Sequence, residues 1–208
     1  MNMRQKQLGI FLSKLKQFKD PKAWAEQHPT EPDIAAEVLW FAYMNRDLED
    51  KVVADLGAGT GVLGISALLL GAKKVYFLEK DPDAIKILKE NLDLLENIET
   101  PTHYEIIQAD VLSFDVKVDL ILENPPFGTK ETHADRDFLE KAVRYGDIIY
   151  TFHKQETSEF VEKFIIKHGF KATHHFDFAF PLKNTMPHHK KRIQRIKVGC
   201  WRIQRINL

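Results

Sequence analysis

Short apolar runs alternate along this chain with longer segments whose apolar residues recur at helical spacing. The runs lie at 52–56, 75–79, 104–108, 118–122 and 147–152. Alternating strand and helix signals are typical of an α/β fold with a parallel sheet. The run at 118–122 is mostly apolar, so we expect that strand to be central and covered on both faces.

The segments between and after these strands have recognisable ends. Glycine-rich 57–64 opens a helix that runs to about Leu70, and Asp81-Pro82 starts another that ends near Asn97. A helix is predicted from Glu156 to His168, with Gly169 as its stop. Two late strands follow, near 171–180 and 192–206, and are expected to complete a seven-stranded, mostly parallel sheet as antiparallel members.

Two helices are predicted before the first strand. The first has an apolar stripe formed by Leu8, Phe11, Leu12, Leu15 and Phe18. After a proline-rich break, Asp33 is placed to cap a second helix, whose stripe is Ile34, Val38, Leu39 and Ala42. We therefore expect one domain over 1–208, with N-terminal helices over 1–46 and a Rossmann-like core over 47–208.

Composition narrows the class of protein. The 208 residues are 44% hydrophobic and 29% charged, which is ordinary for a globular domain and unlike disordered or coiled-coil chains. There is no apolar run of 18 residues and no signal-peptide pattern, so we expect no contact with a membrane. Cys200 is the single cysteine and cannot form an internal disulfide, which favours a cytoplasmic location.

Charge is unevenly distributed although the net charge is zero. Residues 1–22 carry +5 and residues 183–208 carry +8, whereas residues 23–182 carry −13. Basic ends of this kind are typical of proteins that contact a polyanion, and they are equally compatible with solvated tails. Adjacent histidines at 174–175 and 188–189 do not favour a metal site, because neighbours in a strand point to opposite faces.

A glycine-rich turn follows the first core strand in Asp55-Leu56-Gly57-Ala58-Gly59-Thr60-Gly61. Its glycines allow a sharp turn and close approach to a ligand, and Glu79 ends the next strand, where an acid can bind ribose hydroxyls. Two cofactors compete for this pattern. Asp55 would repel the pyrophosphate of a nicotinamide dinucleotide and suits the cationic groups of S-adenosylmethionine, which we therefore favour.

Asp110 follows the third core strand. In this kind of sheet its carboxylate is expected to face the adenine half of the cofactor and accept the exocyclic N–H. The alternative is a purely structural helix cap, a position that aspartate serves well.

The tetrapeptide Asn124-Pro125-Pro126-Phe127 comes directly after the predicted central strand, where open α/β sheets place ligands. The Asn124 side-chain oxygen and the Pro125 carbonyl can each accept one hydrogen of an exocyclic amine, which aims its lone pair at a methyl group. Pro125 and Pro126 make this turn rigid, and Phe127 offers a face on which a target base can stack.

Together, the glycine turn and Asn124-Pro125-Pro126-Phe127-Gly128-Thr129-Lys130 resemble class I S-adenosylmethionine-dependent methyltransferases, and most specifically the methyltransferase-like protein 5 family. This resemblance implies methylation of adenine N6 in structured RNA, most specifically small-subunit ribosomal RNA. It also implies that Gln27 and Thr30 contact the cofactor, and that a small zinc-ribbon activator protein pairs with an edge of the sheet.

Other functions remain open from the residues alone. A protein glutamine N-methyltransferase also carries Asn-Pro-Pro, although usually with tyrosine where this chain has Phe127. A nicotinamide-dependent oxidoreductase would use Gly59–Gly64 but gives 124–127 no role. A binding module without turnover would keep the cofactor pocket alone.

The polar segment 128–146 is either a lid over the target base or a loop followed by a short helix at 138–145.

Overall fold

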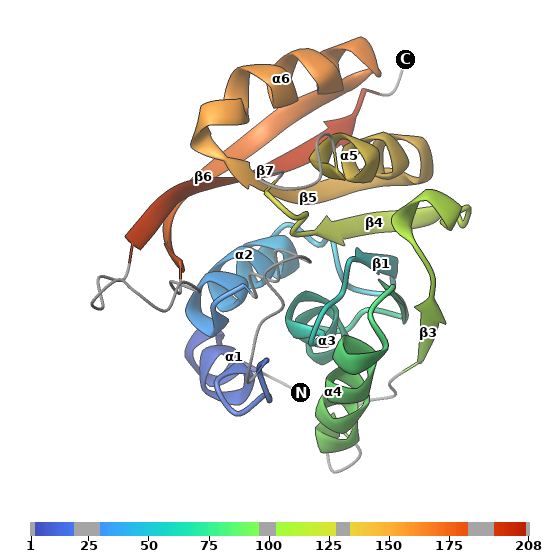
Figure 1. Ribbon diagram of the computed structural model, residues 1–208, viewed down its shortest axis with the longest axis vertical. Helices are drawn as coiled ribbons and strands as arrows, with labels where there is room; N and C mark the ends of the chain where they lie inside the picture. Colours follow the sequence, from blue (N-terminus) through green and yellow to red (C-terminus); the bar gives the residue numbers. More distant parts are fainter. Residues whose placement is uncertain (1–2, 19–29, 96–102, 128–133, 183–193, 207–208) are drawn as a thin grey trace, which may run out of the picture.

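The computed structural model describes residues 3–18, 30–95, 103–127, 134–182 and 194–206. Its centre is a seven-stranded sheet in the order β3-β2-β1-β4-β5-β7-β6. The first five strands in this order pair in parallel, and β7 joins β5 and β6 through antiparallel ladders (Figure 1). The predicted α/β class and mixed seven-stranded sheet are therefore confirmed.

The strands lie close to the predicted runs. They are β1 (Val52–Leu56), β2 (Lys74–Glu79), β3 (Tyr104–Gln108), β4 (Val118–Glu123), β5 (Gly146–Lys154), β6 (Phe170–Leu182) and β7 (Gln194–Arg205). The helices are α1 (Gln5–Leu12), α2 (Pro32–Met44), α3 (Val62–Leu69), α4 (Pro82–Leu92), α5 (Ala134–Tyr145) and α6 (Ser158–Lys167). Strand β4 lies in the middle of the sheet, as its apolar run predicted.

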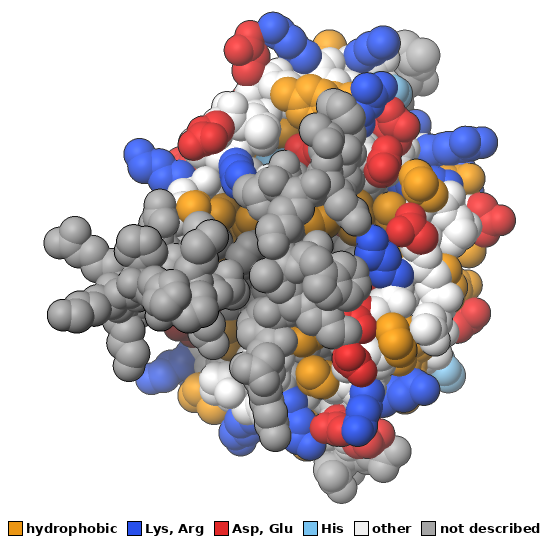
Figure 2. All heavy atoms as spheres, in the orientation of Figure 1, with side chains coloured by type: hydrophobic (Ala, Val, Ile, Leu, Met, Phe, Trp, Pro, Cys, Tyr) orange, Lys and Arg blue, Asp and Glu red, His pale blue; other side chains and the backbone are white. Residues whose placement is uncertain are grey.

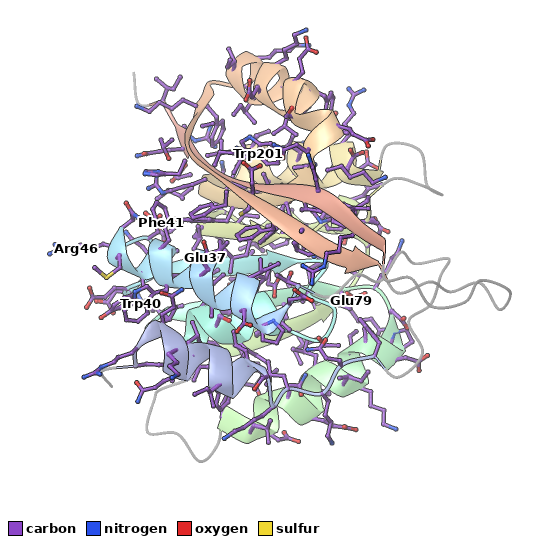
Figure 3. The ribbon with its side chains drawn as sticks, turned by 90° about the vertical axis from the view of Figure 1, so that its left-hand side faces the viewer. Glu37, Trp40, Phe41, Arg46, Glu79 and Trp201 are labelled. Carbon is purple, nitrogen blue, oxygen red and sulfur yellow. The ribbon has the colours of Figure 1, made fainter. Side chains whose placement is uncertain are left out.

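Each face of the sheet has its own hydrophobic core. Helices α1, α2, α3 and α4 lie on one side of the sheet, and α5 and α6 lie on the other (Figure 1). Buried side chains of the first four helices belong to one hydrophobic cluster, and those of α5 and α6 belong to a second. The two-residue alternation of strands divides β4 between them, so Leu120 and Leu122 face the first core while Ile121 faces the second. Figure 3 shows the same division, with Phe41 extending from α2 on one side of the sheet and Trp201 on the other.

The N-terminal segment differs from its prediction. Helix α1 ends at Leu12, before Leu15 and Phe18, because the Ser13 hydroxyl bonds to the Ile10 carbonyl and the following amides bond three residues back. Leu15 is nevertheless buried. The chain then runs past α4, where Asn91 exchanges two hydrogen bonds with the backbone of Lys16.

The predicted cap of the second helix is also wrong by two residues. Glu31 occupies the cap position of α2 and Pro32 the first turn, so Asp33 lies inside that turn. Proline at this position needs no hydrogen-bonded N–H, which explains why the helix begins there. The predicted stripe on α2 is confirmed, because its four members are all buried.

A buried ion pair ties the segment after α2 to the antiparallel end of the sheet. Both oxygens of Asp47 accept from the Arg202 guanidinium, at 2.7 and 2.9 Å, and Tyr150 donates to the same carboxylate at 2.7 Å. On the surface that faces the viewer in Figure 2, acidic and basic side chains are interspersed among the described residues.

Candidate active site

The glycine turn joins β1 to α3 in a backbone conformation that requires glycine. Gly57, Gly59 and Gly61 all have positive φ, of 69°, 55° and 89°. A side chain at Gly61 would also collide with Leu88 of α4. The turn is therefore held close to its neighbours, and it presents backbone N–H groups at the carboxyl edge of the sheet.

Glu79 stabilises this turn from the end of β2. Its two carboxylate oxygens accept from the Gly59 amide and from the Asp81 amide, each at 2.8 Å. Glu79 thus lies against the glycine turn, twenty residues after Gly59 in the chain, and its contact with a ribose stays a prediction. A carboxylate oxygen has further lone pairs, so these bonds leave Glu79 able to accept from a ribose hydroxyl.

Asp55 lies beneath the turn and is buried. Its Oδ2 accepts from the Gly64 amide in the first turn of α3 at 2.8 Å. Burial raises the pKa of Asp55 to about 7, although the Gly64 hydrogen bond opposes the shift. A cation beside the carboxylate would favour the ionised form, and the predicted contact of Asp55 with the positively charged end of S-adenosylmethionine stays a prediction.

Asn124 and Thr30 meet at the end of β4. The Asn124 side-chain nitrogen donates to Thr30 Oγ1 at 3.1 Å, and Thr30 is buried. This bond fixes the orientation of the amide, with its oxygen on the side away from Thr30. Two residues predicted for different reasons, one from the motif and one from the resemblance, therefore lie in direct contact.

Phe127 is more buried than a base-stacking role suggests. Its side chain is 9% exposed and packs edge-to-face against Phe180, with ring centroids 6.2 Å apart. Stacking on a target base remains a prediction for this residue. In the described structure its ring is part of the hydrophobic core that also contains Phe152 and Phe180.

Asp110 occupies the position of a cap. It accepts from the Leu112 amide at 3.0 Å, and its other oxygen lies 3.6 Å from the Lys80 ammonium. The structural alternative considered for this residue is therefore present. Its carboxylate lies at the end of β3, next in the sheet to Glu79, and its contact with an adenine stays a prediction.

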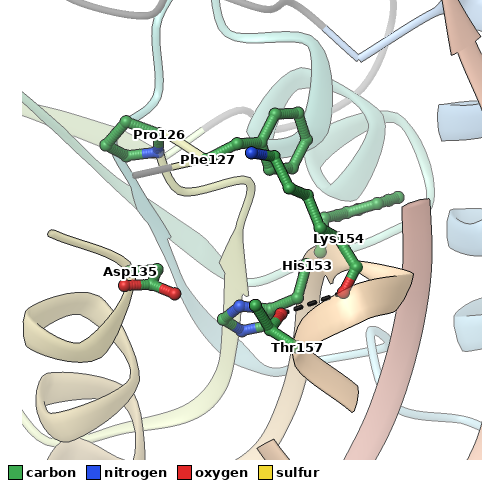
Figure 4. A pocket seen from close by; sticks show the side chains of 7 residues that line it. Pro126, Phe127, Asp135, His153, Lys154 and Thr157 are labelled. Atoms are coloured by element: carbon green, nitrogen blue, oxygen red, sulfur yellow. Dashed lines mark hydrogen bonds between the residues drawn. The ribbon is translucent and has the colours of Figure 1, made fainter. Parts of the chain in front are cut away.

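A small pocket lies beside the tetrapeptide (Figure 4). It is lined by Pro126, Phe127, Asp135, Phe152, His153, Lys154 and Thr157. Figure 4 places Pro126 and Phe127 on one side of it and Asp135 and His153 on the other, with Lys154 extending alongside Phe127. The segment left open as lid or helix contributes Asp135 from the first turn of α5.

Sequence reasoning missed a buried polar chain behind this pocket. Thr151 Oγ1 donates to Glu123 at 2.7 Å and lies 2.7 Å from His153 Nε2. Burial raises the pKa of Glu123 to about 8 and lowers the pKa of His153 to about 4. The available signal was the placement of polar residues at alternate positions of the buried strand β5.

Gln17 and Asn91 were also missed. The Thr60 hydroxyl donates to Gln17 Oε1 at 3.4 Å, and Asn91 donates to the Thr60 carbonyl at 2.9 Å. The Gln17 amide nitrogen is buried with no hydrogen-bond partner among the described residues. Gln17 and Asn91 therefore contact Thr60 of the glycine turn from segments that are far apart in the sequence.

The groups around the turn fit S-adenosylmethionine. Its ammonium and ribose hydroxyls are donors, which match the carboxylates of Asp55 and Glu79. Its carboxylate is an acceptor, which matches backbone amides of the turn and the Gln17 amide nitrogen. Gln27, also predicted to contact the cofactor, lies outside the described residues, as do 128–130.

Two features of the described residues bear on other kinds of site. No group of three or more His, Cys, Asp or Glu side chains is placed there to hold a metal ion. Within the same ranges, no helix has the length and apolar character needed to cross a bilayer.

Comparison with known proteins agrees with this geometry. The family model described as "Conserved hypothetical protein 95" matches residues 14–172. An uncharacterised protein of Methanocaldococcus jannaschii, MJ0284, is 37% identical, with 98% of this chain and 95% of the relative covered. The rRNA N(6)-adenosine-methyltransferase METTL5 of Danio rerio is 33% identical, with 94% and 96% covered.

Among solved structures, PH1948 of Pyrococcus horikoshii is similar over 98% of this chain and 99% of its own. The two are 44% identical and superpose with a TM-score of 0.87, and PH1948 is named as a candidate RNA methyltransferase. These similarities extend over nearly the whole chain. The chain therefore belongs to the Conserved hypothetical protein 95 family and to the family of METTL5-like rRNA N(6)-adenosine methyltransferases.

Proposed function

We propose that this chain transfers a methyl group from S-adenosylmethionine to N6 of an adenosine in ribosomal RNA. The observation that carries the proposal is the anchoring of Asn124 at the carboxyl end of the central strand, in a rigid turn next to the glycine loop. The full-length relationship to METTL5-like enzymes supports the choice of base and of RNA. Small-subunit rRNA is the specific target that we propose.

The chain's own residues orient the amine. The Asn124 side-chain oxygen and the Pro125 carbonyl each accept one hydrogen from N6, which turns the nitrogen lone pair toward the donor. Both acceptors are preorganised, because Thr30 holds the Asn124 amide and the two prolines restrict the backbone. When bound, S-adenosylmethionine supplies an electrophilic methyl group on a positively charged sulfur.

Residues on the neighbouring strands hold the donor. Asp55 and Glu79 stand at the ends of β1 and β2, and we propose that they bind its cationic and ribose groups. Asp110, at the end of β3, accepts from the adenine amine of the donor in this arrangement. In this proposal the three acidic residues, at the ends of three adjacent strands, contact successive parts of the donor molecule.

The RNA contacts are proposed for the basic ends. Arg195 and Lys197 are exposed on β7, near the basic segment 183–193. Lysine and arginine bind phosphates without reading sequence, so these residues position the substrate rather than choose the base. Base choice then depends on Asn124 and the turn that carries it.

A small zinc-ribbon activator is proposed to pair with the sheet at β3. This strand forms one edge of the sheet, and Tyr104 on it is 43% exposed. An edge strand presents backbone donors and acceptors to a further strand. A cytoplasmic location is proposed alongside, because the single cysteine, Cys200, is a buried free thiol.

The test compares three acceptors with the purified chain and radiolabelled donor. These are deproteinised rRNA, intact small ribosomal subunits and bulk protein, followed by nucleoside analysis. We expect N6-methyladenosine in RNA, and Asn124→Ala should abolish it while donor affinity changes only a few fold. Label in protein glutamine instead would replace this proposal with the protein methyltransferase, and an active Asn124→Ala variant would remove the acceptor role.

A further inference from the structure

Glu123, Thr151 and His153 form a hydrogen-bonded chain that the methyl-transfer geometry above does not use. Glu123 and Thr151 are opposite each other in the β4–β5 ladder, and His153 lies two residues further along β5. The three side chains therefore share one face of the sheet, toward α5 and α6. All three are buried, with side chains at most 1% exposed.

This chain ends at the pocket beside the tetrapeptide. His153 lines that pocket together with Pro126 and Phe127, the residues directly after the two proposed amine acceptors (Figure 4). Its Nε2 is the atom that meets Thr151, so Nδ1 is the ring nitrogen left to interact with an occupant of the pocket. The other end of the chain, Glu123, directly precedes Asn124.

The partners determine where the hydrogens lie. Thr151 donates its one hydroxyl hydrogen to Glu123, so its contact with His153 requires Nε2 to be the donor. A neutral imidazole protonated at Nε2 has a lone pair at Nδ1. Ionised Glu123 thus makes Nδ1 of His153 an acceptor, and protonated Glu123 permits the reverse direction of both hydrogen bonds.

Other charged groups around the chain are few within the described residues. Asp135 of α5 and Lys154 of β5 line the same pocket. On the β7 side, Trp201 packs between His153 and His175, with ring centroids 6.0 and 4.5 Å away, and Asp177 lies 3.7 Å from His175. Trp201 therefore separates His153 from the nearest titratable groups of β6.

We propose that His153, Thr151 and Glu123 carry away the proton that the target amine releases when it is methylated. As the N6–methyl bond forms and the sulfur–methyl bond breaks, N6 becomes positively charged. It then releases one of the two protons that had been hydrogen-bonded to Asn124 and Pro125, and this proton passes to His153 Nδ1. The Nε2 proton passes to Thr151, and the Thr151 proton passes to the Glu123 carboxylate. His153 ends neutral in its other tautomer, and Glu123 ends as a neutral acid.

The two ends of the chain are suited to different tasks. His153 touches the pocket but binds a proton weakly, because burial lowers its pKa to about 4. Glu123 is held away from the pocket and binds a proton near neutrality, because burial raises its pKa to about 8. Its Oε2 has no hydrogen-bond partner among the described residues, which further favours protonation. His153 is therefore the group that first accepts the proton, and Glu123 is the group that finally holds it.

One test needs no substrate. In protein labelled with nitrogen-15 at histidine, long-range proton–nitrogen spectra distinguish the two tautomers, and a His153→Gln variant assigns the signal. We expect the Nε2–H tautomer of His153 above about pH 8 and the Nδ1–H tautomer below it, with the ring neutral in both. Thr151→Val should uncouple the tautomer from this titration, whereas Thr151→Ser should preserve it.

A second test measures single-turnover methyl transfer to rRNA as a function of pH, and so rests on the proposed function. Above about pH 8, Glu123→Gln and Thr151→Val should slow transfer about tenfold, somewhat below the usual contribution of general base catalysis, since a methylated amine loses its proton readily. Both should lose the rate inflection near pH 8. Thr151→Ser should retain it, and Glu105→Gln on β3 is the matched control.

The tautomer spectra and the methyl-transfer rates test different proposals, so a negative result in one does not decide the other. A wild-type protein that methylates no acceptor would overturn the proposed function, and the spectra would still decide the hydrogen-bond chain. A His153 tautomer that stays the same from well below to well above pH 8 would overturn the proton path. So would a pH–rate profile that Glu123→Gln and Thr151→Val both leave unchanged.

Discussion

Asn124 donates from its side-chain nitrogen to Thr30, across 94 positions of sequence and at 3.1 Å. This bond decides which atom of the amide faces away from the N-terminal segment. Thr30→Val keeps the side-chain shape and removes the acceptor, so the Asn124 amide loses the hydrogen bond to Thr30 that helps to orient it. We expect single-turnover methyl transfer to fall on the order of 100-fold, the usual cost of misplacing a reacting group.

The control for this prediction is Thr30→Ser, which keeps the hydroxyl and should recover most of the rate. Donor affinity, measured by calorimetry, should change less than the rate in Thr30→Val. A variant that loses donor binding and rate equally would instead assign Thr30 to the cofactor alone.

Glu79 holds the glycine turn through two backbone amides. Glu79→Ala removes both bonds and the proposed ribose acceptor. Because a hydrogen bond to a charged group contributes about 1.5–3 kcal/mol, donor affinity should fall at least tenfold. Glu105→Ala, on the neighbouring strand but exposed and paired with Lys74, should leave affinity unchanged. Equal affinities for wild type and Glu79→Ala would contradict a ribose role.

Local patterns in the sequence predicted the strands well. The bounds of β1 and β3 match the predicted runs, and β4 is central, because apolar runs that need cover on both faces have few alternatives. Helix α1 was predicted too long, since the Leu15 and Phe18 stripe continues beyond the helix. Leu15 is buried all the same, so burial alone did not indicate helix there.

The candidate site also has parts that local sequence patterns predict and parts that they do not. The glycine turn and tetrapeptide are local, and sequence alone identified them. The Asn124–Thr30 bond and the chain from Glu123 to His153 depend on which strands become neighbours, which local patterns do not reveal. Glu123 in particular looks like the polar end of an apolar run, and only the ladder with β5 places Thr151 opposite it.

The Asp47–Arg202 pair should dominate the stability of the antiparallel end of the sheet. Both side chains are less than 10% exposed, at 3% and 9%. Removing one partner of a buried pair strands the other charge, so Arg202→Leu should lower the free energy of unfolding by about 3–5 kcal/mol. In urea denaturation, the double variant Asp47→Leu/Arg202→Leu should be more stable than Arg202→Leu. Additive losses in the double variant would contradict strong coupling.

Glu123 should make the fold less stable in alkaline solution. Its folded-state pKa of about 8 lies above its usual value of 4.5, so the folded state binds a proton that the unfolded chain releases. The contribution of protonated Glu123 to the stability of the folded state is complete below pH 4.5, and it is lost as the pH rises through about 8. At about 1.4 kcal/mol per unit of pKa shift, the loss amounts to a few kcal/mol.

Glu123→Met removes this titration and should be more stable than wild type above pH 8, as measured by urea unfolding at several pH values. His153 acts in the opposite direction and at lower pH, because its pKa is lowered from 6.5 to about 4 and stability falls as pH drops through that range. Asp55 titrates in both proteins. The difference between wild type and Glu123→Met therefore isolates Glu123, and a pH-independent difference would contradict the raised pKa.

Salt dependence of RNA binding tests the role of β7. Deleting residues 1–22 would be a poor test, because it removes the buried Leu8 and Leu12 along with the charges. Arg195→Gln/Lys197→Gln changes only exposed side chains. If both contact phosphates, the slope of log affinity against log salt should decrease by about 0.7–0.9 per lost contact. Lys163→Gln on α6, where the lysine pairs with Glu159, is the matched control. Equal slopes in the double variant and the control would assign RNA binding to other basic residues.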